Sequence, residues 1–304
     1  MLGRQLLEVF LQTMPSPFPD SMKFRVQCQL EYGLHSSATF FFAVRGVAAG
    51  GQNILAESLT TDPLVAFEEF DNVGGMNRII RLQTVNPGRL VVRYVADFSN
   101  AVRLVPLATI GSDGPASLSP EAIPFLFPSR YCQSDRLRSL AQDLFGHLTN
   151  PYAVAAAVSD WVFENIAYVS GSSGETSSAM DTIECRSGVC RDFAHLCIAF
   201  CRALNVPARY VSCYANLLDP PDFHACFEAY VDGWWYVFDA TRLAQLNGLI
   251  RIATGRDAAD TAVCTIFGNP DLLLSSVSCF NLDADYIPMT RDALAARQEA
   301  IALL

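Results

Sequence analysis

Residues 184–211 read ECRSGVCRDFAHLCIAFCRALNVPARYV, and this stretch decides the fold of the chain. Apolar side chains recur in it at positions i, i+3 and i+4, which is the spacing of one face of an α-helix. The pattern predicts a helix over residues 189–204, which Asn205 and Pro207 end. Cys190 falls in the first turn of this helix.

The first turn of a helix is a suitable place for a reactive thiol. The unpaired backbone N–H groups and the positive end of the helix dipole favour the thiolate form of a cysteine there. Cys190 lies at such a helix start, and Ser187 and Gly188 stand shortly before it. Taken alone, Cys190 is more often a packing thiol than a nucleophile, so its assignment depends on what lies near it.

A hairpin further along the chain supplies the neighbours. Asp232 and Gly233 separate two extended segments, residues 223–231 and 234–242, and a two-residue Asp-Gly loop strongly favours a β-hairpin. We expect the last residue of the first strand to pair with the first residue of the second. One face of this hairpin then carries residues that can pack in a core: Phe223, Phe227, Phe238, Tyr236 and Trp234.

The opposite face of the hairpin carries His224 and Asp239. Period-two alternation makes them diagonal neighbours with backbones about 7–8 Å apart, so their side chains can meet. With Cys190 they suggest a division of labour: His224 takes the thiol proton, Asp239 orients the imidazole, and the thiolate attacks a carbonyl carbon to form a thioester acyl-enzyme. The Cys190 backbone N–H can donate to the oxyanion. A second donor is not identified, and Tyr168 and residues 171–182 are candidates.

Other side chains near Cys190 suggest structural roles. His195 lies five residues beyond Cys190 and therefore off its helix face, so we expect it to be structural. We expect Arg191 and Asp192 to form hydrogen bonds or ion pairs in the first turn.

The N-terminal third of the chain predicts an all-β domain over residues 22–103. Apolar and polar side chains alternate from Lys23, as in a half-buried strand. Further strand-like runs occur at 39–44, 53–58, 78–84 and 89–98, separated by turn residues. Short strands at this spacing favour a β-sandwich or a small barrel.

The rest of the chain completes the expected domain organisation. Residues 104–131 are rich in proline and lack periodicity, which is typical of a linker. Residues 132–304 form the second domain, with two successive helices near its start, further strands and a C-terminal helix over 290–304. Residues 1–21 precede the first strand, and we expect a mobile arm or an incorrectly assigned start of translation.

Composition limits the classes of function. Apolar residues make up 51% and charged residues 17%, which excludes a mainly disordered chain. The net charge of −10 disfavours nucleic-acid and membrane-surface partners and mildly favours neutral or basic peptides as substrates. No run of 18 apolar residues occurs, and the N-terminus makes a poor signal peptide. We therefore expect a cytoplasmic protein; its oligomeric state is not indicated.

The ten cysteines do not suggest a metal site. They include no Cys-x-x-Cys pair, and the four histidines form no group with zinc-ligand spacing. No loop has the oxygen-ligand spacing of a calcium site. We expect no metal and no cofactor, and we expect the nine cysteines other than Cys190 to be packing thiols in a reducing compartment.

Three segments resemble successive signatures of a known family, the transglutaminase-like superfamily in its bacterial branch of candidate cysteine proteases. They are GVCRDFAHL (188–196), FHACFEAYVDGWWYVFDATR (223–242) and GRDAAD (255–260). The similarity covers most of residues 130–275. The strand-rich segment from Met22 is similar to the N-terminal β domain that accompanies such cores.

This resemblance implies a fold and a set of roles. The fold is α+β: a papain-like, transglutaminase-like core in which the helix bearing the cysteine packs on an antiparallel sheet, preceded by the sandwich-like domain. The implied roles are nucleophile for Cys190, base for His224 and orienting group for Asp239.

The expected function is that of a thiol enzyme acting on amide bonds of a peptide or protein substrate. Hydrolysis by a peptidase or amidohydrolase is favoured over acyl transfer from protein glutamine to an amine, the transglutaminase reaction. A binding module that keeps the fold without turnover is the third possibility. Retention of all three residues argues against that module.

Overall fold

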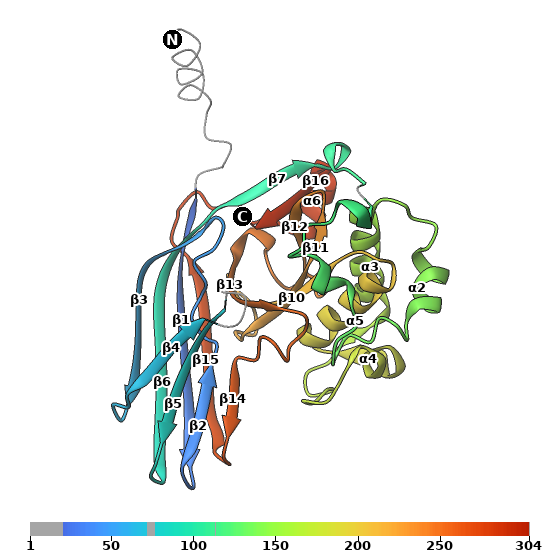
Figure 1. Ribbon diagram of the computed structural model, residues 1–304. Helices are drawn as coiled ribbons and strands as arrows, with labels where there is room; N and C mark the ends of the chain where they lie inside the picture. Colours follow the sequence, from blue (N-terminus) through green and yellow to red (C-terminus); the bar gives the residue numbers. More distant parts are fainter. Residues whose placement is uncertain (1–20, 72–76, 113, 304) are drawn as a thin grey trace, which may run out of the picture.

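The computed structural model describes residues 21–71, 77–112 and 114–303. Two lobes lie side by side, one built of long strands and the other of a sheet covered by helices (Figure 1). The N-terminal arm expected over residues 1–21 lies, except for Ser21, outside the described residues.

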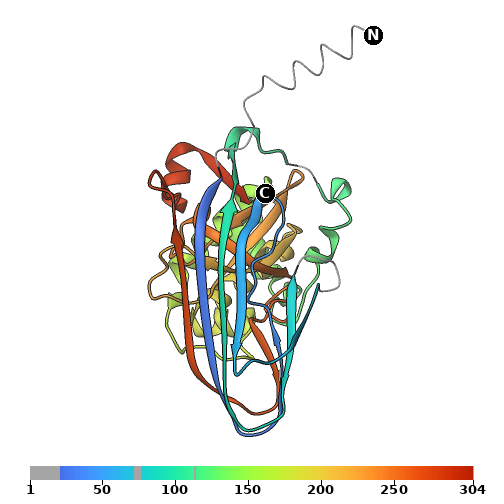
Figure 2. The same cartoon turned by 90° about the vertical axis from the view of Figure 1, so that its left-hand side faces the viewer.

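The strand lobe is a β-sandwich of two four-stranded antiparallel sheets, seen face-on in Figure 2. The first sheet has the order β15 (Asp271–Asn281), β1 (Met22–Leu34), β6 (Gly88–Asn100) and β3 (Gln52–Asp62). The second has the order β14 (Cys264–Phe267), β2 (Ala38–Phe42), β5 (Arg78–Thr84) and β4 (Phe67–Asp71). Every second side chain of β1 is buried between the sheets, as its alternating pattern predicts.

The expected domain boundaries differ from this arrangement in two places. Strands β14 and β15 were assigned to the second domain, but they pair with β2 and β1 of the sandwich. Strand β7 (Val102–Pro106), expected at the start of the linker, pairs with β16 (Glu299–Leu303) in the other lobe. These pairings join segments more than 190 residues apart, and alternation within a strand does not specify its partner.

The helical lobe is built on a six-stranded antiparallel sheet. Its order is β13 (Leu249–Gly255), β10 (Ala208–Ala215), β11 (His224–Val231), β12 (Trp234–Phe238), β16 and β7. Its main helices are α2 (Arg138–Phe145), α3 (Pro151–Asn165), α4 (Ala179–Cys185) and α5 (Cys190–Ala203), with α6 (Arg291–Arg297) near the C-terminus. A helix that bears Cys190 thus packs on an antiparallel sheet, and the expected α+β fold is confirmed.

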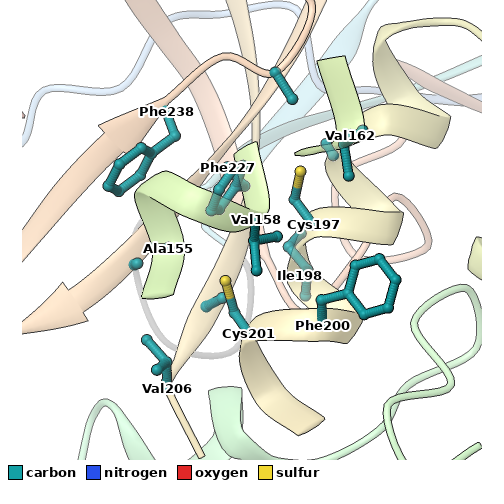
Figure 3. Close-up of a cluster of buried hydrophobic side chains, with 14 of the residues drawn as sticks. Ala155, Val158, Val162, Cys197, Ile198, Phe200, Cys201, Val206, Phe227 and Phe238 are labelled. Atoms are coloured by element: carbon teal, nitrogen blue, oxygen red, sulfur yellow. The ribbon is translucent and has the colours of Figure 1, made fainter. Parts of the chain in front are cut away.

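The core of this lobe lies between α3, α5 and the sheet (Figure 3). Cys197 and Cys201 of α5 are fully buried there among side chains such as Val158 and Phe227. They behave as the expected packing thiols. All ten cysteines are free, but Cys185 is exposed, so the expectation that all nine others pack is wrong at that position.

The two lobes share apolar packing. Tyr214 and Ile250 of the six-stranded sheet belong to the same buried cluster as the sandwich residues. The Tyr214 hydroxyl also donates to the Val44 carbonyl at 2.5 Å. This packing fixes β10, and with it the neighbouring strand β11, against the sandwich.

The β11–β12 hairpin has the predicted register. Val231 pairs with Trp234, and the two turn residues between them have φ values of 50° and 81°, as a primed hairpin turn requires. Phe227, Tyr236 and Phe238 are buried on the expected apolar face. Trp234 is 37% exposed and lies under the Arg103 guanidinium instead.

The hairpin turn provides a test of the fold. Gly233→Ala should destabilise the protein by about 1–2 kcal/mol because φ is +81° there, while an added Cβ would meet no atom within 4 Å. Chemical denaturation with urea measures the difference. Gly174→Ala is the matched control, since Gly174 has equally open space without the left-handed backbone. Equal stability of the two variants would contradict the prediction.

The C-terminal helix ends earlier than expected. The prediction of a helix over 290–304 is correct for α6 only, because Gln298 adopts φ 55° and the chain continues as β16. Pairing with β7 and β12 buries Ala300, Ile301 and Ala302. Burial in the sheet outweighs the high helix propensity of this alanine-rich segment.

Candidate active site

Cys190 is the first residue of α5, as its sequence position predicts. The Asp192 carboxylate accepts the Val189 N–H at 2.8 Å and also the Ser173 hydroxyl. A Cβ on Gly188 would lie 2.6 Å from the Asp192 Cβ, so only glycine allows this close approach. The Asp192 carboxylate therefore caps the start of α5 and holds the turn that presents Cys190.

The loop before α4 is fastened to the same turn. The Arg191 guanidinium donates to the Gly174 carbonyl and lies 3.4 Å from an Asp192 carboxylate oxygen. Both residues therefore make the expected first-turn contacts. Together with the Ser173 bond, they hold the loop next to Cys190.

His224 and Asp239 lie at the end of the hairpin opposite the turn. His224 is the first residue of β11, and Asp239 directly follows the last residue of β12. The His224 Nε2 lies 3.0 Å from the Asp239 Oδ2, and both residues are buried. Cys190 lies close enough to His224 for its thiol to act on the pKa of the imidazole. The structure thus brings all three sequence-predicted residues together, and Nδ1 is the ring nitrogen left for the thiol.

Asp239 accepts three hydrogen bonds besides its contact with His224. The Thr241 backbone N–H and hydroxyl donate to Oδ1 at 3.0 and 2.7 Å, and the Ala244 N–H donates to Oδ2 at 3.0 Å. Sequence reasoning missed both residues. An aspartate carboxylate often accepts from the backbone N–H two residues later, which closes a local turn. This signal could have identified Thr241, two residues after Asp239.

The protonation of the pair follows from these contacts. Burial alone would lower the pKa of His224, but the Asp239 carboxylate and Cys190 raise it well above its ordinary value of 6.5. Burial would raise the pKa of Asp239, and His224, Thr241 and the Ala244 N–H together lower it. An imidazolium facing a carboxylate is therefore the favoured state near neutral pH.

Two tyrosines lie near the thiol, and the charge of Asp222 acts on one of them. Tyr168 is 46% exposed, and its ring packs against Phe193 of α5 at 5.8 Å between centroids. Burial raises the pKa of Tyr168, on which the charges of Cys190, His224 and Asp222 also act. Tyr210 of β10 is buried close enough to Cys190 for the thiol to affect it. Sequence reasoning missed Tyr210 and Asp222, although Asp222 stands only two residues before His224.

His195 has a packing role, as its helix position predicts. Its ring stacks on Tyr131 and contacts Tyr210, with centroids 5.0 and 5.1 Å away. Its Nε2 accepts the Ala258 N–H at 3.1 Å. Burial, followed by the charges of Arg191 and Arg202, lowers its pKa well below 6.5, so the ring is neutral.

Metal-binding and membrane-spanning features were searched over the described ranges only. Within them, no cluster of three or more His, Cys, Asp or Glu residues could hold a metal ion. None of the described helices has the length and apolarity needed to span a bilayer.

Sequence profiles of two families match the chain. The Transglutaminase-like superfamily matches residues 138–240, which include all three side chains of the site. The profile of the bacterial transglutaminase N-terminal domain matches residues 22–109, which cover most of the sandwich.

Curated relatives share only part of this chain. The uncharacterized protein ML0607 of Mycobacterium leprae is 32% identical over 121 residues, 37% of this chain and 43% of that protein. The uncharacterized protein Rv2569c of Mycobacterium tuberculosis is 29% identical over 152 residues, 44% of this chain and 47% of that protein. The matches thus span less than half the length of these relatives.

A solved structure is similar over nearly the whole chain. A candidate cysteine protease from Cytophaga hutchinsonii is 44% identical, with a TM-score of 0.91, and the match covers 94% of this chain and 99% of that one. Between them, the two profiles and this structure cover both lobes and the three residues of the site. The chain belongs to the transglutaminase-like superfamily.

Proposed function

We propose that this protein is a thiol enzyme that cleaves or transfers acyl groups at amide bonds. Cys190 is the nucleophile, His224 the general base and acid, and Asp239 the group that orients the imidazole. One observation carries the proposal: the His224 Nε2 lies 3.0 Å from the buried Asp239 carboxylate, and this imidazole is close enough to Cys190, the first residue of α5, for the thiol to act on its pKa. These are the contacts that activate a thiol.

The reaction proceeds in two steps. The Cys190 sulfur bonds to the amide carbon and the carbonyl π pair moves to oxygen. This pair then re-forms the C=O bond as the C–N bond breaks and His224 protonates the departing amine. A thioester remains on Cys190. In the second step His224 removes a proton from water or an amine, which attacks the thioester and releases the thiol.

Water is the favoured second reactant, so we propose a peptidase or amidohydrolase acting on a peptide or protein. The similarity to the Cytophaga hutchinsonii candidate cysteine protease supports this choice. Transfer to an amine is the second candidate, because residues 22–109 match the bacterial transglutaminase N-terminal domain. The cytoplasmic location and the absence of nucleic-acid and membrane partners stay predictions.

Selective alkylation of Cys190 tests the thiol chemistry. At pH 6 iodoacetamide should label Cys190 about 10- to 100-fold faster than the exposed Cys185, because the proposed mechanism pairs the Cys190 sulfur with the His224 imidazole, which activates it as a nucleophile. Burial raises the pKa of Cys132 and Cys201 to about 12, so these thiols should label still more slowly. Peptide mass spectrometry after timed quenching gives each rate.

Two variants control this measurement. His224→Ala should reduce the labelling rate of Cys190 to that of Cys185. His35→Ala, which changes a histidine whose side chain is 62% exposed on the sandwich, should leave the rate unaltered. Equal labelling of Cys190 and Cys185 in the wild-type protein would reject the proposed mechanism.

A peptide library incubated with and without an added primary amine separates the two candidate reactions. Mass spectrometry should show cleaved peptides in both samples for a peptidase, and amine adducts only in the second sample for an acyltransferase. Rapid labelling of Cys190 without any product would instead support a binding module.

A further inference from the structure

A small pocket lies where the sandwich meets the chain segment that leads into His224. Its volume is about 170 Å³, and its walls are mostly apolar. One wall comes from the connection between β10 and β11, with Leu217, Leu218, Pro221 and Asp222, and the other from β15 of the sandwich, with Val277 and Phe280. Leu217 and Phe280 are exposed, so the pocket opens to solvent between the two lobes.

Hydrogen bonds fix the two walls against each other. The Leu217 N–H donates to the Cys279 carbonyl at 3.1 Å, and the Asn281 N–H donates to the Asn216 Oδ1 at 2.7 Å. These bonds join the connection to β15. The pocket is therefore formed in the free protein, and its shape depends on both lobes.

The pocket adjoins the candidate active site. Asp222 of its wall stands two residues before His224, so their Cα atoms are at most about 7 Å apart. The charge of Asp222 also acts on Tyr168, which lies near Cys190. An extended peptide advances about 3.3 Å per residue. A substrate residue within a few positions of the bond that Cys190 attacks can therefore reach the pocket.

We propose that this pocket is a specificity subsite that holds one apolar side chain of the substrate, of the size of leucine or methionine, close to the cleaved bond. A site for a whole small molecule measures about 300–1,000 Å³, so a pocket of this volume takes a single side chain. The Asp222 carboxylate at its wall disfavours an acidic side chain. Leu217 and Phe280 thus determine specificity and take no part in the bond-breaking steps.

A larger cavity, of about 610 Å³, lies too far away for this role. It surrounds the hairpin turn, where Val231, Asp232 and Gly233 line it. His224 and Val231 are the two ends of β11, and seven residues of strand span about 23 Å. Residues next to the cleaved bond cannot reach that distance.

Matched peptides test the inference, which rests on the proposed function, in the full-length protein. Library peptides that the wild-type protein turns over should share an apolar residue at one position near the cleaved bond. Exchange of this leucine or methionine for alanine should lower kcat/KM by about 10- to 100-fold, and exchange for glutamate should lower it further. Competition between two peptides in one sample, followed by mass spectrometry, measures the ratio of their kcat/KM values.

Two variants each remove one wall of the pocket. Leu217→Asn suits the φ of 52° at this position, since asparagine tolerates the left-handed region, and Phe280→Ala truncates the wall from β15. Each should reduce the leucine-to-alanine ratio by about fivefold or more. Labelling of Cys190 by iodoacetamide should change by less than about twofold, because the small reagent does not fill the pocket. A merely structural defect would slow both peptides and the labelling together.

Matched controls replace exposed side chains outside the pocket. Leu272→Asn on β15 and Phe267→Ala on β14 make the same changes at exposed positions of the sandwich. Both should keep the wild-type ratio. A loss of the ratio in these controls as large as in Leu217→Asn and Phe280→Ala would overturn the subsite.

The subsite and the proposed function fail in different ways. If the wild-type protein turns over peptides that share no apolar position, or if Leu217→Asn and Phe280→Ala keep the wild-type ratio, only the subsite is overturned. If the wild-type protein shows neither rapid labelling of Cys190 nor any product, both proposals are overturned. Rapid labelling without product overturns the subsite together with turnover and leaves the reactive thiol.

Discussion

Amide turnover should fall by about 10⁴-fold or more in Cys190→Ser and in His224→Ala, and the double variant should be no slower than the slower single variant. Side chains that act as one unit lose their effect together, so their losses do not add. Initial rates on a cleaved library peptide measure all three variants against the wild-type protein.

The matched control for the nucleophile is Cys185→Ser. Cys185 is an exposed thiol five residues before Cys190, and we expect its replacement to leave turnover unaltered. Losses that add in the double variant, or a comparable loss in Cys185→Ser, would contradict the assignment of Cys190 and His224 to one catalytic unit.

The largest expected effect on stability concerns Glu228 of strand β11 in the hairpin. Its carboxylate is completely buried and accepts from the Arg209 Nε at 2.6 Å, while the Arg251 Nε lies 3.2 Å from its other oxygen. Arg209 also lies over the Trp235 ring at 4.1 Å. Glu228→Ala should lower the free energy of unfolding by about 3–5 kcal/mol, because it leaves buried guanidinium charge without its carboxylate.

Two further variants show whether the charge is responsible. Glu228→Gln keeps the shape and an acceptor oxygen, so the difference between it and Glu228→Ala separates lost packing from lost charge. Asp97→Ala breaks the exposed ion pair with Arg25 and should cost less than about 1 kcal/mol. Urea denaturation at pH 7 measures each variant. A loss below about 1 kcal/mol for Glu228→Ala would show that the buried charges are compensated in another way.

Much of the helical lobe was predictable because its signals are local. The apolar repeat of residues 189–204 predicted α5 within one residue at each end. The start of α3 is also marked locally: Pro151 is its first residue, and the Asn150 side chain accepts from the Ala153 N–H. Asp232 and Gly233 predicted the hairpin and its register, because only a tight turn with two positive φ values matches the twist of the strands.

The errors concern contacts between distant segments. The strand β16 was expected to be helical, and β14 and β15 were assigned to the wrong lobe. Strand β4 was missed altogether: all five of its side chains are exposed, so it shows no alternation of buried and exposed residues. In each case the deciding hydrogen bonds come from a strand that the local pattern does not specify.

The sequence by itself determined the helix start at Cys190 and the hairpin that carries His224 and Asp239, because turn chemistry and side-chain periodicity are properties of neighbouring residues. The superfamily was indicated by the resemblance of three segments to its signatures. Only the tertiary structure decided that α5 packs on this hairpin with the thiol within reach of His224, and that Thr241 and Ala244 donate to the Asp239 carboxylate. These contacts join separate elements, and their geometry depends on how the elements pack rather than on the spacing of residues within any one of them.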